Sequence, residues 1–266
     1  MTALRLTPLF ALGNLRAWRI IERNMLVYSH TWMVLLSGFF EPFFYLLSIG
    51  FGLGRLVGDV AGPGGQTIPY ALFVAPALLA ASSMNGAVTE STFNFFFKLN
   101  YDKTFASILT TPMSAGDISL GELAWALMRG ALYAVGFLGV MVVFGLVRSP
   151  LVVLTLPASL LIGFAFAAVG MAATSFMRTW QDFDLIQLVI LPMFLFSGTF
   201  FPLDAVPDGV RLLIQLTPLY QGVDLLRTLS VGVVGPDTLV HVAYLTVMGL
   251  VGLFVVSRRL DKLLLK

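Results

Sequence analysis

The side chains of this 266-residue sequence that could do chemistry are few, and their spacing gives little support to catalysis. Asp182 and Asp184 flank one phenylalanine, the Asp-x-Asp pattern with which some glycosyltransferases hold a metal ion and a nucleotide-sugar. Three residues make a weak pattern, and carboxylates at the start of a helix are favoured by the helix dipole in any case. His30 and His241 have no second histidine at ligand spacing, and there is no cysteine. We therefore expect no metal centre, disulfide or thiolate, and place both histidines at interfaces.

Glu41 is the most costly single charge, because it lies beside Pro42 inside an apolar stretch. A charged side chain at the centre of a membrane helix costs on the order of 2.5–3.5 kcal/mol on insertion scales. One interpretation is that Glu41 lines a substrate path or the seam between two subunits. The other is a protonated, packed Glu41 bonded to the backbone, where Pro42 leaves a carbonyl one turn earlier without its donor. Both interpretations stay open.

Glu90, Glu122 and Arg129 lie toward the same ends of two further apolar stretches. Glu122 and Arg129 are seven residues apart and therefore share a helix face. We expect these three side chains to form an ion-pair network that holds the helices together near a cytoplasmic connecting segment. A site for the head group of a substrate is the alternative.

The elements that must position these side chains are membrane helices. Hydrophobic residues make up 58% of the chain and charged residues 11%, and the mean hydropathy is +0.91. Ordinary soluble domains carry roughly a quarter charged residues, so this surface must face lipid. The net charge is only +2 and the basic residues are scattered, so we expect no nucleic-acid partner. Continuous apolar runs predict an all-α integral membrane protein with six membrane-spanning helices. The predicted spans are residues 32–54, 70–90, 121–146, 150–175, 184–201 and 237–257.

Residues 1–31 are predicted to form an amphipathic helix at the membrane interface rather than a cleaved signal peptide. Apolar side chains recur at helical spacing opposite three arginines, a pattern typical of helices that lie in the headgroup region. An ordinary packed helix is the alternative. The apolar face comprises Phe10, Ala17, Trp18, Ile21, Met25 and Tyr28, and the basic face comprises Arg16, Arg19 and Arg23.

The basic residues also predict the orientation of the chain. With a cytoplasmic amino terminus, eleven lysines and arginines fall inside and four fall outside, which favours two cytoplasmic termini. The four outer residues are Arg55, Arg148, Arg211 and Arg227.

Two connecting segments are unlike simple loops. In the inner segment, residues 91–120, we predict a helix over 101–111 that stops at Pro112. An exposed apolar stripe on such a helix indicates a docking surface for a protein. The outer segment, residues 202–236, holds two short apolar pieces split by Thr217-Pro218, which predict re-entrant or interfacial helices. The inner stripe comprises Tyr101, Phe105, Ile108 and Leu109.

Three stretches of the sequence resemble the permease subunit of type-2 ATP-binding-cassette exporters, in the branch of NodJ-type nodulation-factor permeases and daunorubicin-resistance-type permeases. Residues 101–112 (YDKTFASILTTP) resemble the coupling helix of that family and its closing Thr-Pro. Residues 197–207 (SGTFFPLDAVP) resemble the motif after its fifth span. Residues 217–232, with Thr-Pro-Leu-Tyr and Val-Asp-Leu-Leu-Arg, resemble the segment before its sixth span. The resemblance covers residues 1–266 as one permease domain.

The resemblance implies that two such permeases pair, as a homodimer or with a close paralogue, and that each docks one cytosolic ATP-binding-cassette ATPase subunit. It implies outward transport of an amphipathic, lipid-linked or drug-like substrate across a bacterial cytoplasmic membrane. The chain lacks a Gly-x-x-x-x-Gly-Lys-Ser/Thr run, so we expect no cofactor here and place ATP, Mg²⁺ and hydrolysis in the partner ATPase. The residues expected to couple to that ATPase are Tyr101, Asp102, Phe105, Ile108 and Leu109.

Two other classes of protein compete with this interpretation. An integral membrane enzyme acting on lipid-linked sugars would use Glu41 or the Asp182–Asp184 pair, but the acids are spread singly along the chain rather than clustered. A proton-driven secondary transporter would show internal repeat symmetry, which the sequence lacks.

Overall fold

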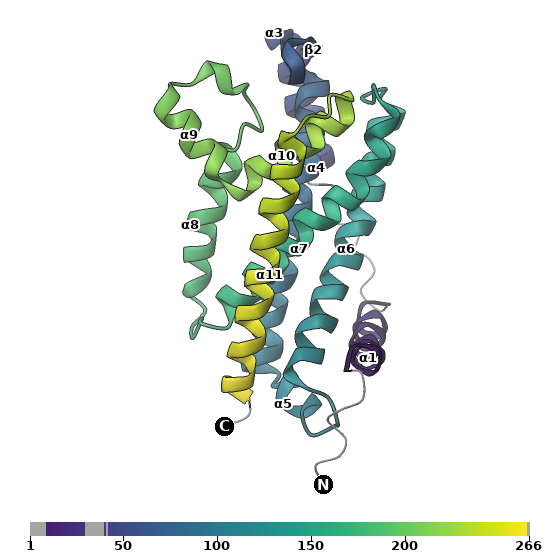
Figure 1. Cartoon of the computed structure of the whole chain (residues 1–266), viewed down its shortest axis with the longest axis vertical. Helices are drawn as coiled ribbons and strands as arrows, with labels where there is room; N and C mark the ends of the chain where they lie inside the picture. Colours follow the sequence, from purple (N-terminus) through teal and green to yellow (C-terminus); the bar gives the residue numbers. More distant parts are fainter. Residues whose placement is uncertain (1–8, 30–39, 41, 265–266) are drawn as a thin grey trace.

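The structure is a computed structural model that describes residues 9–29, 40 and 42–264. Within these residues, four helical stretches are long and apolar enough to cross a membrane, and they lie lengthwise along the long axis of the molecule (Figure 1). This helical architecture agrees with the predicted all-α membrane protein. The four stretches are Tyr70–Tyr101, Ala115–Val143, Pro150–Thr174 and Asp237–Leu264.

The four stretches match the second, third, fourth and sixth predicted spans in position. The first predicted span, 32–54, lies partly outside the described residues, which show a shorter apolar helix over Pro42–Val57. The fifth, 184–201, corresponds to α8 (Asp182–Leu195). Its 14 residues rise about 21 Å, less than the roughly 30 Å of a hydrocarbon core. The count of six spans therefore stays a prediction.

Helix α4 (Tyr70–Thr89) forms the centre of the bundle. Helices α6 (Ala115–Val143), α7 (Thr155–Thr174) and α10 (Pro218–Val231) all pack against it. Nearly every residue of α4 is buried, and its sequence is apolar on all sides, as a helix surrounded by other helices requires.

Helix α11 (Asp237–Leu264) packs along α7 through small residues. A Cβ atom on Gly252 would lie 2.7 Å from the carbonyl carbon of Ala168, so only glycine permits this approach. Small residues at helix contacts let backbones come close and gain dispersion energy where lipid removes the hydrophobic driving force.

The helix of α4 continues through π-helical turns, η3 (Glu90–Asn94) and η4 (Phe97–Tyr101). Lys103 then takes a left-handed backbone conformation, with φ of 49°, and separates η4 from the short helix α5 (Thr104–Ile108). The predicted helix over 101–111 is therefore wrong in extent, because the left-handed turn ends one helix and starts another within it.

Ser114 starts α6 with a capping box. Its hydroxyl accepts the backbone N–H of Asp117, and the Asp117 carboxylate accepts the backbone N–H of Ser114. These reciprocal bonds satisfy donors that every helix start leaves free. α5 and the C-terminal end of α11 lie at the same end of the bundle, which we call the α5 end (Figure 1).

The opposite end of the molecule carries a small hairpin and short helices (Figure 1). Strands β1 (Asp59–Ala61) and β2 (Thr67–Pro69) pair antiparallel, with Asp59 opposite Pro69. The other short elements are η1 (Leu46–Leu53), α3 (Gly54–Val57), η2 (Pro63–Gly65), η5 (Pro150–Leu154) and η6 (Leu203–Ala205).

The two helices predicted within 202–236 are present as α9 (Asp208–Leu216) and α10, divided at Thr217. They differ in surroundings: α10 is largely buried among α4, α7 and α11, whereas α9 exposes Leu212 and Leu213. The buried helix fits the re-entrant interpretation and the exposed one the interfacial interpretation.

Arg227 on α10 is not the outer loop charge that the orientation count assumed. Its guanidinium is buried, donates to the carbonyl oxygens of Phe73 (3.2 Å) and Gly198 (2.8 Å), and lies 3.7 Å from the centre of the Phe73 ring. Because the side chain binds protein rather than water, three outer basic residues remain in the count instead of four.

Candidate functional site

Glu90 and Arg129 form the centre of a buried polar network near the α5 end. Glu90 comes from the first π-helical turn after α4, and Arg129 comes from α6. Arg129 Nη1 lies 2.5 Å from Glu90 Oε2, and both side chains are almost fully buried. Asn94 donates to the same carboxylate oxygen at 2.7 Å, and Tyr133 accepts from Arg129 Nε at 2.9 Å.

Glu122 and Lys98 form a second pair beside the first. Lys98 Nζ lies 2.6 Å from Glu122 Oε2 and 4.0 Å from Glu90 Oε1. Glu90 Oε1 has no hydrogen-bond partner among the described residues, and the Lys98 ammonium 4.0 Å away provides compensating charge. Two acids and two bases thus meet in one neutral cluster, which we call the ion-pair network.

Helix α1 (Leu9–Ser29) supplies the remaining polar groups of the network. Asn24 donates to both carboxylate oxygens of Glu122 at 3.4 Å, and the Tyr28 hydroxyl donates to Glu90 Oε2 at 3.3 Å. Burial, and then the negative charge of Glu90, raise the pKa of Tyr28 well above its usual value. Tyr28 therefore stays a neutral donor to the carboxylate.

The structure places Glu90, Glu122 and Arg129 in ion pairs, as the first interpretation expected, but Glu122 and Arg129 do not pair with each other. Glu122 and Arg129 share a helix, yet each pairs with a residue of the η3–η4 segment. Lys98 and Asn24 were not predicted to belong to this network. Lys98 lies about two helical turns after Glu90, and this spacing could have indicated it.

The network joins three elements that differ in their surroundings: α1, the π-helical end of α4, and α6. Buried ion pairs add little net stability, because desolvation of the charges offsets their attraction. Removing one partner is costly, since it leaves an uncompensated buried charge. The arrangement therefore links these three elements, because moving any one of them away would leave buried polar groups unpaired.

The apolar face of α1 packs on α6 rather than facing lipid throughout. Ala17 and Ile21 are buried, as is Ile20, whereas Trp18 and Met25 remain exposed. The prediction of an interfacial helix needs this correction: one side of the helix is a protein contact, as the packed-helix alternative expected. Gly121 of α6 lies against Ala17 and Ile20 there.

The segment from Tyr101, the last residue of η4, to the start of α6 exposes polar side chains beside this one large aromatic. Tyr101 is 60% exposed, and Asp102, Lys103 and Ser107 are also exposed. Phe105 is not part of an exposed stripe: it is fully buried, with its ring centre 4.9 Å from that of Phe95. The left-handed turn at Lys103 changes the helical phase, so Tyr101 and Phe105 do not share a face as predicted.

Ile108 and Leu109 are half-buried and pack against the core. The apolar members of the predicted stripe thus mostly hold the segment to the bundle, and the surface open to a partner is Tyr101 with its polar neighbours. We call this surface, residues 101–103, 106–107 and 110–112, the coupling surface.

The other candidate residues lie apart from this network. Glu41 and His30 lie outside the described residues. Asp182 accepts backbone N–H groups of Arg178 and Thr179 at 2.7 and 3.0 Å, which lowers the pKa of its carboxyl. It therefore stabilises the turn before α8, and in the described chain no three acidic or histidine side chains gather to hold a metal.

His241 lies at a helix interface, as predicted. Its ring nitrogens contact Gln221 Oε1 at 2.5 Å and Asp224 Oδ2 at 3.0 Å, which joins α11 to α10.

Apolar bundle helices, close glycine contacts and a buried, charge-neutral network define a multi-pass helical membrane protein. Comparison with known proteins gives its family. Residues 16–230 match the sequence profile described as ABC-2 type transporter, and the chain belongs to this family. The family comprises membrane subunits of transporters, so the chain is a transmembrane ABC transporter subunit and not itself the ATPase.

Several relatives carry the name Nodulation protein J. That of Rhizobium leguminosarum bv. trifolii is 31% identical over 256 residues, which cover 96% of this chain and 96% of the relative. That of Sinorhizobium fredii is 33% identical over 232 residues, 87% of each chain. That of Rhizobium meliloti is 32% identical over 227 residues, 85% of this chain and 82% of the relative. These matches support the NodJ-like branch and do not favour a membrane enzyme.

Proposed function

We propose that the chain is one of two permease subunits of an ATP-driven exporter, and that it moves an amphipathic, lipid-linked or drug-like substrate outward across a bacterial cytoplasmic membrane. In this proposal both termini and the α5 end face the cytoplasm. An ATP-binding-cassette ATPase that binds ATP and Mg²⁺ docks on the coupling surface. Six spans cross the membrane, and Glu41 in the first span serves the substrate path or the seam between the two subunits.

The observation that carries the proposal is the position of the ion-pair network relative to the coupling surface. Lys98 belongs to η4, which ends at Tyr101, so the coupling surface begins three residues after a buried charge. A push on Tyr101 or Asp102 would therefore be transmitted to Glu122 on α6. The exposed polar surface and the buried charges together have the properties expected of a device that converts ATPase movement into helix movement.

Cysteine cross-linking tests the proposed docking directly, because the chain has no cysteine of its own. Asp102→Cys or Ser107→Cys would be placed on the coupling surface, and Asp59→Cys at the opposite end would serve as the matched control. We expect a bifunctional maleimide to link the first two variants, and not the third, to a co-expressed ATP-binding-cassette ATPase partner. No link from either coupling-surface cysteine, with the ATPase still co-purifying, would place its docking site elsewhere.

The two subunits of the proposed pair are tested by co-purifying two differently tagged copies of the chain. Recovery of both tags together supports a homodimer, and recovery of only one tag favours a close paralogue as the second permease.

A further inference from the structure

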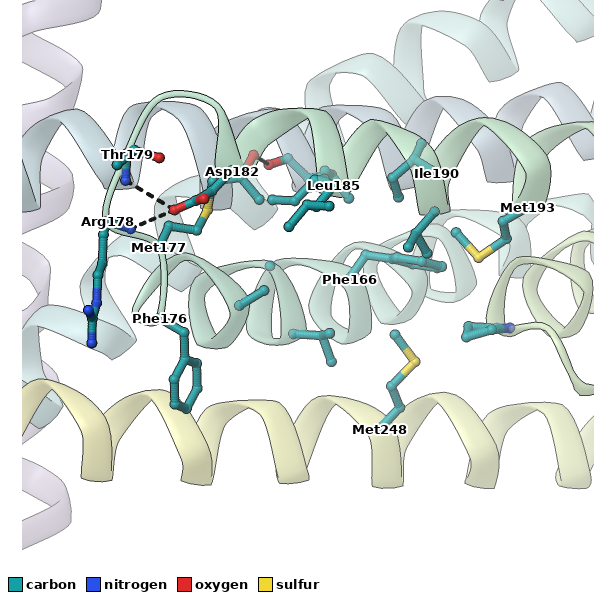
Figure 2. Close-up of a pocket in the computed structure, with 18 residues that line it drawn as sticks. Phe166, Phe176, Met177, Arg178, Thr179, Asp182, Leu185, Ile190, Met193 and Met248 are labelled. Atoms are coloured by element: carbon teal, nitrogen blue, oxygen red, sulfur yellow. Dashed lines mark hydrogen bonds between the residues drawn. The ribbon is translucent and has the colours of Figure 1, made fainter.

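An apolar groove runs between α7 and α8 (Figure 2). Phe166 of α7, Ile190 and Met193 of α8, and Met248 of α11 line its apolar part. The groove has a volume of about 770 Å³, within the roughly 300–1,000 Å³ of ligand sites. It exists because α8 stands away from the bundle: none of its residues is buried.

A second, polar pocket of about 900 Å³ adjoins one end of this groove. Three basic side chains, Arg178, Arg259 and Lys262, line it together with a single acid, Asp261. The pocket therefore carries a net positive charge. It lies at the α5 end of the bundle, where α11 approaches its C-terminal end (Figure 1).

The groove and the polar pocket are neighbours that share three lining residues, Phe176, Met177 and Arg178. Arg259 lies against one of the shared residues, since its guanidinium carbon is 4.7 Å from the centre of the Phe176 ring. Arg259 Nε is buried and finds no hydrogen-bond acceptor in the described chain. Neither Arg178 nor Arg259 belongs to an ion pair among the described residues.

Arg178, Arg259 and Lys262 line this pocket without an ion-pair partner among the described residues, so a bound anion would balance their charge. Phosphate oxygens suit arginine in charge and geometry. An apolar groove beside a basic pocket matches a molecule with one anionic end and one hydrocarbon end. Basic pockets between membrane helices are recognised binding places for anionic head groups.

We propose that this composite site holds one anionic phospholipid of the surrounding bilayer. Its phosphate lies against Arg178, Arg259 and Lys262, and one acyl chain occupies the groove between α7 and α8. The site requires only that the chain lies in a membrane, so it stands independently of the proposed transport cycle.

Lipid titration of the purified full-length protein, in its assembled state, tests this proposal. Dioleoyl phosphatidylglycerol and dioleoyl phosphatidylcholine have the same acyl chains, and bound lipid per chain can be counted by native mass spectrometry. We expect one phosphatidylglycerol per chain to bind before any phosphatidylcholine. Glycerol phosphate, which has the anionic group without the acyl chains, should not compete at equal concentration.

Matched variants separate the two parts of the site. Arg259→Gln should weaken phosphatidylglycerol binding by about tenfold, because a charge-assisted contact is lost. Arg258→Gln makes the same charge change one residue earlier, where the side chain does not line the pocket, and should leave binding unchanged. Arg178→Gln, at an exposed position, repeats the test if Arg259→Gln fails to fold. Ala173→Trp should fill the groove and weaken binding, whereas Val135→Trp on exposed α6 surface should not.

Four results would overturn the proposal. Equal binding of the two phospholipids would make the groove a site for any acyl chain, and effective competition by glycerol phosphate would make the pocket a site for phosphate alone. Equal losses in Arg258→Gln and Arg259→Gln would indicate general surface attraction. Absence of bound phosphatidylglycerol from the assembled protein would favour a helix of a second copy as the occupant.

Discussion

Arg16 on α1 donates a hydrogen bond of 2.8 Å to the backbone carbonyl of Pro112, which lies 96 residues further along the chain. Pro112 belongs to the coupling surface, so the N-terminal helix touches the proposed ATPase dock as well as the ion-pair network. One helix therefore contacts the coupling surface at Pro112 and the buried charges through Asn24 and Tyr28. In the proposed function, this double contact makes the position of α1 one of the features on which coupling depends.

Gly121→Ala should dislodge α1. A Cβ atom at this position would lie 2.9 Å from the Ala17 carbonyl oxygen and 2.7 Å from Ile20 Cβ, so α1 must shift. We expect the free energy of unfolding to fall by about 1–3 kcal/mol, as in other overpacked sites. Gly130→Ala on the same helix meets no atom within 4 Å and is the control. The free energy of unfolding of both variants in detergent tests this prediction, and equal stability would show that α1 does not pack as described.

Glu90→Gln should destabilise the protein strongly, because it leaves the charges of Arg129 and Lys98 without their shared carboxylate. Breaking a buried pair typically costs about 3–5 kcal/mol. Combining it with Arg129→Gln should recover part of that loss, because the second change removes one of the unpaired charges. A double-mutant cycle on unfolding free energies measures this coupling, and strictly additive losses would mean that the two residues do not interact.

Phe105→Ala and Tyr101→Ala should have different consequences although the two residues lie in one segment. Phe105 is fully buried, so its truncation should lower the free energy of unfolding by about 3–5 kcal/mol. Tyr101 is largely exposed, and its truncation should leave stability nearly unchanged while reducing co-purification of the ATPase. Thermal unfolding and pull-down are measured on both variants. Normal ATPase recovery with Tyr101→Ala would remove Tyr101 from the dock.

Cysteines at the two ends of the bundle should be accessible from opposite sides of the membrane. Asp59→Cys should react with a membrane-impermeant maleimide in intact cells, whereas Ser107→Cys should react only after the cells are opened. The asymmetry of basic residues is the reason for this orientation. Labelling of both positions in intact cells would exclude the proposed topology.

The bundle helices could be predicted from the sequence because a long apolar run in lipid must satisfy its own backbone hydrogen bonds, which a helix does. The helix over 101–111 was predicted wrongly because the residue that turns left-handed is Lys103. Glycine is the residue that usually indicates such a turn in a sequence. Phe105 was taken for a surface anchor for the same reason, since a change of helical phase moves a side chain to another face.

Only three members of the ion-pair network could be predicted from the sequence. Glu90, Glu122 and Arg129 are conspicuous as charges in apolar surroundings, whereas Asn24 on α1 looks like an ordinary polar residue of a surface helix. The contacts of Asn24 and Tyr28 depend on how α1 is placed, which local periodicity does not specify. The burial of Arg227 could not be predicted either, because the carbonyl groups that it binds come from distant parts of the chain.

The order of charges in the network has a consequence for how the helices find each other during biosynthesis. In each of the two segments the acid comes first and the base follows, eight residues later from Glu90 to Lys98 and seven from Glu122 to Arg129. Each segment is thus neutral in these charges when it enters the bilayer. Because the segments run antiparallel, every acid meets a base, whereas a parallel pairing of the same two segments would set like charges against each other. The pattern therefore favours one polarity and one register of these two segments over the alternatives when the helices pair.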